Sequence, residues 1–346
     1  MLDAAIRIWR DKWEVALALV GIVGASWIPT TWLRQGLWSI LALLLVVDIV
    51  GAVIHEFRMA HARHIPVSIF VPGEQIPEGS VLDAYSAMIA DVIGTVDRVG
   101  FDEKEYRARF GVIQNEWSLW RDTPLPTDSE PWRRLVRRFG VRVHRLSRKL
   151  GDQRVFHIFL RCPSALAVGL GATTGTHHKV VVHHYQPGEG KSPYITVTNS
   201  LKSDKGLRAR LGEEVQRPYE YITVDGPSKI TAELYASVFL ARHDPRGDTE
   251  NKAEETESGV VHVCRSHPGA LTSDDDWLGM AREICDVLLG LVAKKEVSRV
   301  HLVLSCPVAL AFLLGVALGP HSAVTVHNWF RNEQALRPVI ALDQLE

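Results

Sequence analysis

The chain opens with two long apolar segments separated by a short polar turn. Residues 13–33 and 37–56 are almost uninterrupted apolar sequence, joined by Arg34-Gln35-Gly36. A helix of about 20 residues spans the hydrocarbon core of a bilayer, which is roughly 30 Å thick. A cleavable signal peptide would have a shorter apolar region, a small-residue cleavage site and no second apolar segment. The pattern therefore predicts a transmembrane helical hairpin within residues 1–60.

The flanking residues predict how this hairpin is oriented. Arg34 is the only basic residue in the turn, whereas Arg7, Arg10 and Lys12 precede the first segment and Arg58 and Arg63 follow the second. Because cytoplasmic flanks carry an excess of Lys and Arg, we expect both termini in the cytoplasm. Five of the ten tryptophans lie near the ends of the segments, where indole rings favour the headgroup region: Trp9, Trp13, Trp27, Trp32 and Trp38.

The second apolar segment contains Asp48 in its interior, besides the trailing His55 and Glu56. An ionisable group within a span is costly, and it usually faces another helix or water. Two interpretations stay open. Either Asp48 makes a contact within an oligomeric bundle or pore, or its carboxyl group reaches water locally.

Beyond residue 60 the dominant pattern is an internal repeat. Residues 155–197 align without a gap to residues 299–341 at a constant shift of 144, and fifteen of the 43 pairs are identical. The identities include His157 with His301 and the pair Cys162-Pro163 with Cys306-Pro307. A shared amphipathic pattern would not produce so many identities, so the repeat indicates a duplication.

Each copy predicts the same three elements. A short apolar run, HIFL at 157–160 or HLVL at 301–304, is typical of a strand buried on both faces. A proline follows and starts an alanine-rich apolar helix, where its missing N–H costs nothing. A β-branched run, KVVVHHY or AVTVHNW, is the next strand. Strand, helix and strand predict an α/β fold of doubly wound type, built from two Rossmann-like units with parallel sheets.

Other segments complete this arrangement. Two first strands are predicted at 67–73 and 236–244, and two helices at 132–150 and 277–295. Charged segments punctuated by Gly or Pro predict loops at 121–131 and, as a loop or hairpin excursion, at 244–259.

The composition bears on which kinds of molecule the protein could bind. Lys plus Arg number 39 and Asp plus Glu 40, so the net charge of -1 argues against a DNA or RNA polymer as partner. The cysteines, Cys162, Cys264, Cys285 and Cys306, are widely spaced and form no CxxC pair. This spacing favours reduced, buried thiols over a disulfide framework or a zinc ribbon.

The repeat and the hairpin together resemble proteins of bacterial anti-phage defence. Residues 157–171 with 180–185, and their partners 301–315 with 324–329, resemble the SAVED domain, a fusion of two CARF-like Rossmann units. The resemblance covers residues 65–346, and the hairpin ahead of it resembles the transmembrane SAVED effectors of CBASS operons. It implies three domains: a transmembrane module at 1–60, a first CARF-like unit at 61–225 and a second at 226–346.

The resemblance also implies a function. In such families the SAVED domain binds a cyclic oligonucleotide made by a partner synthase after infection, and binding promotes assembly. We therefore expect a two-pass protein of the bacterial inner membrane with a cytoplasmic SAVED domain. It would sense the messenger, form a homo-oligomer and disrupt the lipid bilayer. The ring size and bases of the messenger, the oligomer size, and whether the ligand activates or restrains the effector are left open.

The ligand site is expected where ligands bind in open α/β sheets, beyond the carboxyl ends of the strands. Helix starts after Cys162 and Cys306 present backbone N–H groups suited to phosphate. Arg161 and Arg242 either add charge-assisted contacts or are paired surface groups, and Tyr185 and Trp329 either stack on bases or cap the core. The predicted ligand-binding residues are Pro72, Gly73, Arg161, Cys162, Pro163, Ser164, Tyr185, Arg242, His243, Ser305, Cys306, Pro307 and Trp329.

No metal, cofactor or catalytic residue is expected. The run HHKVVVHH places His177 and His183 on one face of a strand and His178 and His184 on the other, and no further ligand completes a tetrahedral site. No base stands beside Cys162 or Cys306, and no paired carboxylates or Ser-His-Asp arrangement occurs at credible spacing. The protein is therefore expected not to be an enzyme. Two alternatives remain: a membrane-bound ring nuclease-like enzyme that degrades cyclic oligonucleotides, and a ligand-free membrane scaffold.

Overall fold

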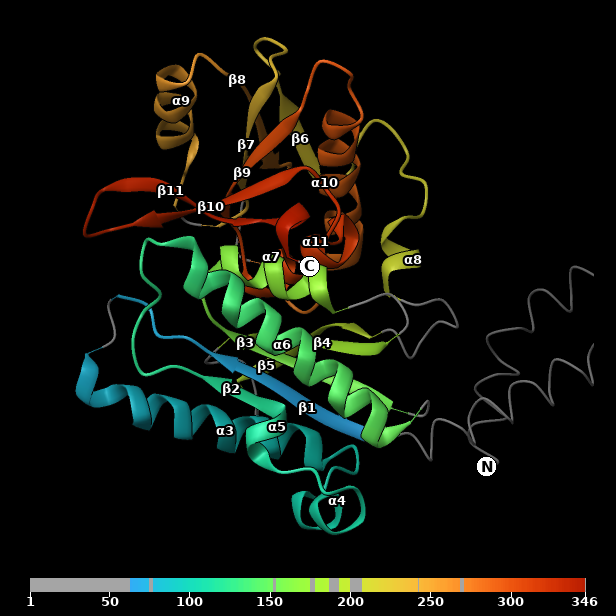
Figure 1. Ribbon diagram of the computed structural model, residues 1–346. Coiled ribbons are helices and arrows are strands. Elements are labelled where there is room, and N and C mark those ends of the chain that lie inside the picture. The colour runs from blue at the N-terminus through green and yellow to red at the C-terminus, as the bar shows by residue number, and fades with distance from the viewer. Residues whose placement is uncertain are drawn as a thin grey trace, which may run out of the picture. The chain divides into compact units, whose positions relative to one another are not determined.

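The computed structural model describes residues 63–74, 77–151, 154–174, 178–186, 193–199, 207–241, 243–267 and 271–345. The chain divides into two compact units, 1–62 and 63–346, and the second contains two mixed α/β lobes (Figure 1). The predicted transmembrane hairpin lies outside the described residues. Within them, no helix is long and apolar enough to cross a membrane.

The first lobe is built on a five-stranded sheet in the order β2-β1-β3-β4-β5. β1, β2, β3 and β4 run parallel, and β5 pairs antiparallel with β4. β3 is buried along nearly its whole length, as expected of an inner strand of a parallel sheet. The strands are β1 Arg63–Phe70, β2 Ser118–Trp120, β3 Arg154–Arg161, β4 Lys179–Tyr185 and β5 Tyr194–Asn199.

The second lobe repeats this order and adds one strand. Its sheet runs β11-β10-β9-β7-β8-β6, with β8, β7, β9 and β10 parallel and with β6 and β11 antiparallel at the edges. The strands are β6 Ile222–Asp225, β7 Glu233–Phe239, β8 Gly259–Arg265, β9 Arg299–Ser305, β10 Val324–Phe330 and β11 Ala335–Ala341. Both sheets are thus mostly parallel, with antiparallel edge strands that the sequence did not predict.

Helices cover both faces of each sheet. α3 and α6 lie on opposite faces of the first sheet, and α9 lies on the face of the second sheet opposite α10 (Figure 1). α6 buries Trp132, Leu135, Val136 and Phe139 at helical spacing, which fixes the face it turns to the core. The helices are α3 Val81–Asp97, α4 Glu103–Phe110, α5 Gln114–Trp117, α6 Ser129–Leu150, α7 Ser164–Thr173, α8 Leu207–Leu211, α9 Arg246–Glu255, α10 Trp277–Val292 and α11 Val308–Leu318, with short 3-10 turns at Glu78–Ser80 and Leu342–Gln344.

The two copies of the repeat meet where α7 crosses α11. A Cβ atom added at Gly171 would overlap the carbonyl oxygen of Phe312, and one added at Gly315 would overlap that of Val168. These positions correspond at the shift of 144, so the crossing is nearly symmetric. Each helix also reaches across to the other lobe: α7 contacts β9 and β10, and α11 contacts β3 and β4. Glycine permits this close approach because it has no side chain.

The sequence predicted the central units of both lobes correctly. The strand–helix–strand units are confirmed as β3-α7-β4 and β9-α11-β10, with β3 parallel to β4 and β9 parallel to β10. The domain boundary at 225/226 stays a prediction, although β6 at Ile222–Asp225 pairs with β8 of the second sheet.

One prediction is wrong. The charged stretch 244–259 is not a loop or hairpin excursion, because residues Arg246–Glu255 form helix α9. Its first turn is supported by the carboxylate of Asp244, which accepts from the backbone N–H of Arg246. Lys252 pairs with Glu255 one turn later at 2.6 Å. These local polar contacts stabilise a helix that contains few apolar residues.

Candidate functional site

The first pocket lies at the carboxyl ends of β1, β3 and β4. It has a volume of about 360 Å³ and a largely apolar wall with one arginine. It is lined by Phe70, Val71, Gly73, Leu160, Arg161, Cys162, Pro163, His184, Tyr185 and Val308. In doubly wound folds, ligands bind beyond the carboxyl ends of the strands, and this pocket lies there.

The second pocket lies at the corresponding edge of the other sheet. Its volume is about 160 Å³, and its wall carries two histidines, one aspartate and one tryptophan. It is lined by Ser164, Ala165, His243, Pro245, Asp248, Val303, Leu304, His327, Asn328, Trp329 and Leu336.

The duplication relates the two pockets. At the shift of 144, Leu160, His184 and Tyr185 of the first pocket correspond to Leu304, Asn328 and Trp329 of the second, and Val308 of the first corresponds to Ser164 of the second. Each pocket is thus formed by the strand ends of one lobe and by the helix start of the other. Because Pro163 lines one pocket and Ser164 the other, the two pockets adjoin.

The loops at the two pockets are held in the same way. The backbone N–H of Val71 donates to the carbonyl of Arg161 at 2.8 Å, and that of Leu240 donates to the carbonyl of Ser305, also at 2.8 Å. Arg161 and Ser305 correspond in the repeat. Each bond extends the parallel pairing beyond the regular strands, so the backbone at the edge of each pocket is fixed before any ligand arrives.

Among the described residues, Arg161 is the one cationic side chain that lines the first pocket. Its guanidinium lies 4.8 Å from the ring centre of Tyr185 and 5.5 Å from that of Phe70, and it donates to the carbonyl of Ala84 at 3.4 Å. Among the described residues it forms no ion pair with a carboxylate. Two aromatic rings therefore orient a guanidinium whose charge is left for an incoming anion.

Both helix starts lack a capping side chain. α7 begins after Pro163 and α11 after Pro307, and neither proline can offer a side-chain acceptor. The first N–H groups of a helix have no intrahelical partner and favour negative charge nearby. The Ser164 hydroxyl donates to the carbonyl of Cys306 at 3.0 Å, which ties the two helix starts together. The arrangement presents backbone donors from both copies at the boundary between the pockets.

The surroundings of the thiols at these turns disfavour the thiolate form. Burial raises the pKa of the Cys306 thiol to about 12, and burial likewise raises the pKa of Cys162. The thiolate is the nucleophilic form, so neither side chain is suited to attack a phosphate. All four cysteines lie in the described part of the chain, and all four are free.

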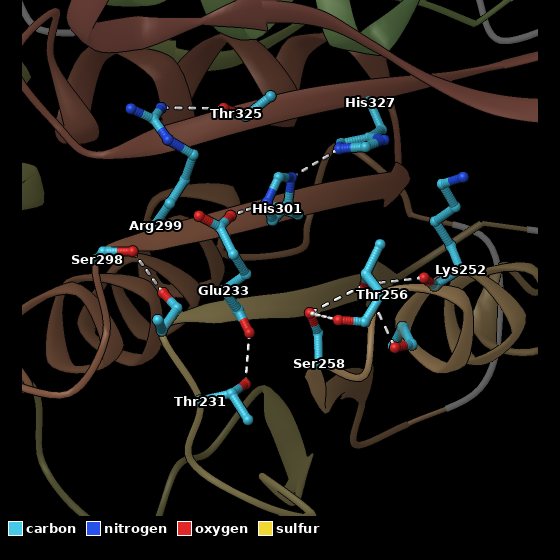
Figure 2. A network of polar contacts seen from close by, with 12 residues as sticks. Thr231, Glu233, Lys252, Thr256, Ser258, Ser298, Arg299, His301, Thr325 and His327 are labelled. Carbon is cyan, nitrogen blue, oxygen red and sulfur yellow. Dashed lines mark hydrogen bonds and ion pairs between the residues drawn. The ribbon is translucent and has the colours of Figure 1, made fainter.

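A row of polar side chains crosses each sheet. In the first lobe His64 Nδ1 lies 2.9 Å from His157 Nε2, and His157 Nδ1 lies 3.0 Å from His183 Nε2. In the second lobe His301 pairs with His327 at 2.9 Å and with the carboxylate of Glu233 (Figure 2). Burial lowers the pKa of His157 to about 2 and that of His183 to about 3, so these rings are neutral near pH 7.

The predicted site residues separate into three groups. Gly73, Arg161, Cys162, Pro163 and Tyr185 meet in the first pocket, and Ser164, His243 and Trp329 meet in the second. Pro72, Ser305, Cys306 and Pro307 line neither pocket, although Cys306 accepts the hydrogen bond from Ser164. Arg242 lies outside the described residues. The assignment of all thirteen residues to a ligand stays a prediction.

Several lining residues escaped the sequence reasoning. Val308 is the repeat partner of the predicted Ser164, so the shift of 144 could have found it. Asn328 and His327 correspond to His184 and His183, which were not predicted as ligand-binding residues either, so the shift alone did not point to them. Asp248 could not have been placed, because the stretch that carries it was predicted as a loop rather than as helix α9.

The described residues contain no group of three or more His, Cys, Asp or Glu side chains able to hold a metal ion. Part of the histidine run, including His177, lies outside them. The predicted lack of a metal therefore stays a prediction.

One protein-family model matches part of the chain. Residues 213–342 match the family described as "SAVED: SMODS-associated and fused to various effectors sensor domain". This match confirms the SAVED resemblance for that part of the chain. No curated protein matches the sequence.

The solved structures to which the chain is similar include SAVED/CARF-domain containing receptors. Two are of the Acinetobacter baumannii Cap4 SAVED/CARF-domain containing receptor, with the cyclic trinucleotides 2'3'3'-cAAA and 3'3'3'-cAAA, at 13% identity and TM-scores of 0.47 and 0.48. The Moraxella osloensis Cap4 SAVED/CARF-domain containing receptor is similar at 11% identity and a TM-score of 0.46. Each alignment covers 85% of this chain, but the chain spans only 54% to 56% of those receptors.

Proposed function

We propose that the protein is a receptor for a cyclic oligonucleotide and works in bacterial anti-phage defence. The observation that carries this proposal is the pair of adjoining pockets related by the duplication. Each offers one exposed or half-buried aromatic ring, Tyr185 or Trp329, and uncapped helix N–H groups. A ring of nucleotides repeats the same base, ribose and phosphate, so a duplicated site matches its chemistry. The SAVED match at residues 213–342 supports a sensor role.

The proposal assigns no catalysis to these pockets. The thiols there have raised pKa values, and a ring nuclease would need a base or nucleophile beside a bound phosphate. Incubation of the protein with its messenger followed by chromatography tests this point. Recovery of the intact ring is expected, and linear or 2',3'-cyclic products would favour the ring nuclease-like alternative.

The proposal further places the effector function in the N-terminal segment. Residues 13–33 and 37–56 have the length and composition of two bilayer spans, and basic residues flank them on the side expected to be cytoplasmic. In this proposal the chain is a two-pass protein of the bacterial inner membrane. Ligand binding assembles the SAVED domains into a homo-oligomer, which gathers the hairpins until the membrane loses integrity.

Calorimetry on the full-length protein in detergent tests ligand binding. The probes are cyclic di-, tri- and tetranucleotides, beginning with 2'3'3'-cAAA and 3'3'3'-cAAA. One ring is expected to bind with a stoichiometry of one per chain, because the two pockets form one duplicated site. If no ring binds, a ligand-free membrane scaffold becomes the better account.

A further inference from the structure

Helix α6 presents an exposed face that is mostly basic. Positions 134, 138, 141, 145 and 148 recur every three or four residues, so they lie along one face of the helix. The exposed arginines on and beside this line, called the basic face of α6 below, are Arg134, Arg137, Arg138, Arg145 and Arg148. Glu130 is the one acidic residue of α6. The face is therefore strongly positive in a chain whose net charge is -1.

Most of these charges are not neutralised by carboxylates of the protein. Arg134 has a carboxylate oxygen of Glu130 at 3.8 Å. In the part of the chain that the structure describes, Arg138, Arg145 and Arg148 form no ion pair. Like charges three or four residues apart destabilise a helix, so an external anion on this face would stabilise α6.

A solvated surface helix does not need this arrangement. The helix dipole favours cations in the last turn, which accounts for Arg148 but not for Arg134 in the first half of the helix. The charges also act on each other: burial, and after it the charges of Arg138 and Arg145, lowers the pKa of the neighbouring Arg142. The basic face is thus a concentrated positive surface without an internal counterpart.

The C-terminal end of α6 lies beside the start of the first sheet (Figure 1). Arg63, the first residue of β1, donates to the carbonyl of Leu150, the last residue of α6. Only residues 57–62 separate Arg63 from the predicted end of the second apolar segment at residue 56. A fully extended chain gains at most about 3.6 Å per residue, so Arg63 is held within about 25 Å of that end. A transmembrane hairpin would therefore hold this end of α6 near the bilayer.

We propose that the basic face of α6 docks on the anionic phospholipid headgroups of the membrane that holds the hairpin. This inference rests on the transmembrane part of the proposed function. Guanidinium groups bind phosphate oxygens in charge-assisted hydrogen bonds, and basic residues close to an anionic leaflet are attracted to it. α6 has 22 residues, which gives a length of about 33 Å. The tether at one end and arginines along the helix together hold it along the surface.

Docking uses none of the groups assigned to the messenger. No arginine of the basic face lines either pocket. β1 runs from Arg63 at the tethered end to Phe70, which lines the first pocket. At about 3.3 Å per residue the two ends of this strand are about 23 Å apart. Lipid binding and messenger binding are therefore separate properties and can be measured separately.

Energy transfer from a fluorophore on α6 to acceptor-labelled lipid tests the docking. The fluorophore is attached through Val141→Cys, at a position 59 % exposed within the basic face. Full-length protein is reconstituted into phosphatidylcholine vesicles with or without phosphatidylglycerol, at equal acceptor content. Transfer is expected to be at least about twofold higher with the anionic lipid. In about 0.5 M salt the difference should disappear, since the Debye length falls to about 4 Å.

A probe on the other face of the first sheet is the positional control. Leu82→Cys on α3 is also 59 % exposed, and α3 lies on the face opposite α6 (Figure 1). Its transfer should not change with the lipid. The four native cysteines are buried or half-buried, and unsubstituted protein measures the labelling background.

A combined variant tests the arginines themselves. Arg138→Gln, Arg145→Gln and Arg148→Gln together are expected to abolish most of the lipid dependence. Glutamine and arginine have similar helix propensities, so the melting temperature should be retained. Binding of the ring in detergent should also be unchanged, because these side chains line neither pocket.

The matched control removes the same charge from the second lobe. Lys229→Gln, Lys294→Gln and Lys295→Gln change three exposed lysines there, and the wild-type lipid dependence should remain. An equal loss in both combined variants would overturn the docking, because only net charge would then matter.

Two further results would overturn the docking while leaving the hairpin intact. One is equal transfer with and without phosphatidylglycerol in vesicles that retain the protein in alkaline carbonate. The other is energy transfer between labelled copies that ignores the lipid, which would assign the basic face to a second copy of the chain. Release of the protein by alkaline carbonate would instead contradict the transmembrane hairpin, and the docking would be abandoned with it.

Discussion

Arg161 shows how a single side chain is prepared for an anion. Its guanidinium lies against the rings of Tyr185 and Phe70, which limits its rotamers without neutralising its charge. A charge-assisted hydrogen bond to phosphate contributes roughly 1.5–3 kcal/mol, so Arg161→Gln is expected to weaken binding of the ring by about tenfold to a hundredfold. Calorimetry checks this. Arg148→Gln, an exposed position on α6 that lines neither pocket, is the matched control. Equal affinity of Arg161→Gln and wild type would remove Arg161 from the site.

The buried histidines predict how stability depends on pH. Burial holds the folded-state pKa of His157 at about 2 and those of His183 and His327 at about 3, below the unfolded value of 6.5. The unfolded chain therefore binds more protons once the pH falls below about 6.5, and stability is lost towards acid. Each histidine contributes up to about 1.4 kcal/mol per pH unit.

Melting temperatures of the full-length protein between pH 8 and pH 4.5 test this expectation. The melting temperature should be nearly constant above pH 7 and should fall steeply below about pH 6. His183→Phe removes one titrating ring and should make the fall shallower, whereas replacement of the exposed His144 by Phe should leave the slope unchanged. A melting temperature that rises towards acid would contradict the neutral assignment of these rings.

For single residues, the internal repeat was the most informative signal in the sequence. The shift of 144 relates Tyr185 to Trp329 and Ser164 to Val308. Of these four, all but Val308 were predicted as ligand-binding residues. Ser305, Cys306 and Pro307 were predicted as ligand-binding residues, yet none of them lines either pocket. The sequence also did not reveal that Ser164 and Val308, at the helix starts, line the pocket of the other lobe, because spacing along the chain does not show which lobe a helix start faces.

Among the elements, α7 and α11 join the two lobes through contacts between glycine and backbone. Gly315→Ala is expected to force the helices apart or abolish folding, because its Cβ would overlap the carbonyl of Val168. The free energy of unfolding should fall by more than about 2 kcal/mol, as it does at other overpacked core positions. Gly290→Ala on α10 is the control: nothing lies within 4 Å of its Cβ, and helix propensity favours alanine by about 1 kcal/mol. Thermal melting of both variants checks the difference, and equal melting temperatures would rule out this crossing as a rigid junction.

The elements that the sequence predicted well are the buried ones. Continuous apolar runs form β3, α7, β9 and α11. Such runs must be buried, so the sequence predicts them as core strands or helices. α9 was missed because its helix rests on polar contacts at Asp244 and Lys252 rather than on an apolar stripe. The antiparallel strands β5 and β11 were missed because a single edge strand has no distinctive pattern.

At the scale of the whole molecule, we propose that ligand binding causes the membrane to leak. Liposomes of bacterial lipid that contain the full-length protein are expected to retain a trapped dye until the ring that binds is added, and then to leak. Arg161→Gln should shift the leakage to higher ligand concentrations by the same factor as its loss of affinity. Asp48→Asn distinguishes the two interpretations of that carboxylate, because only a pore contact would change leakage without changing affinity.

The match at residues 213–342 confirms the sequence resemblance for the second lobe, and the first lobe shares its strand order. The transmembrane hairpin rests on composition and length alone. Whole-molecule function was therefore predictable only through the resemblance, since fold by itself does not determine the ligand.

The most direct test of the central claim is calorimetric titration of the full-length protein with cyclic di-, tri- and tetranucleotides. The account predicts that one ring binds at one per chain, and that Arg161→Gln weakens that binding whereas Arg148→Gln does not. Absence of binding by every ring, or two independent ligands per chain, would contradict a single receptor site built by duplication.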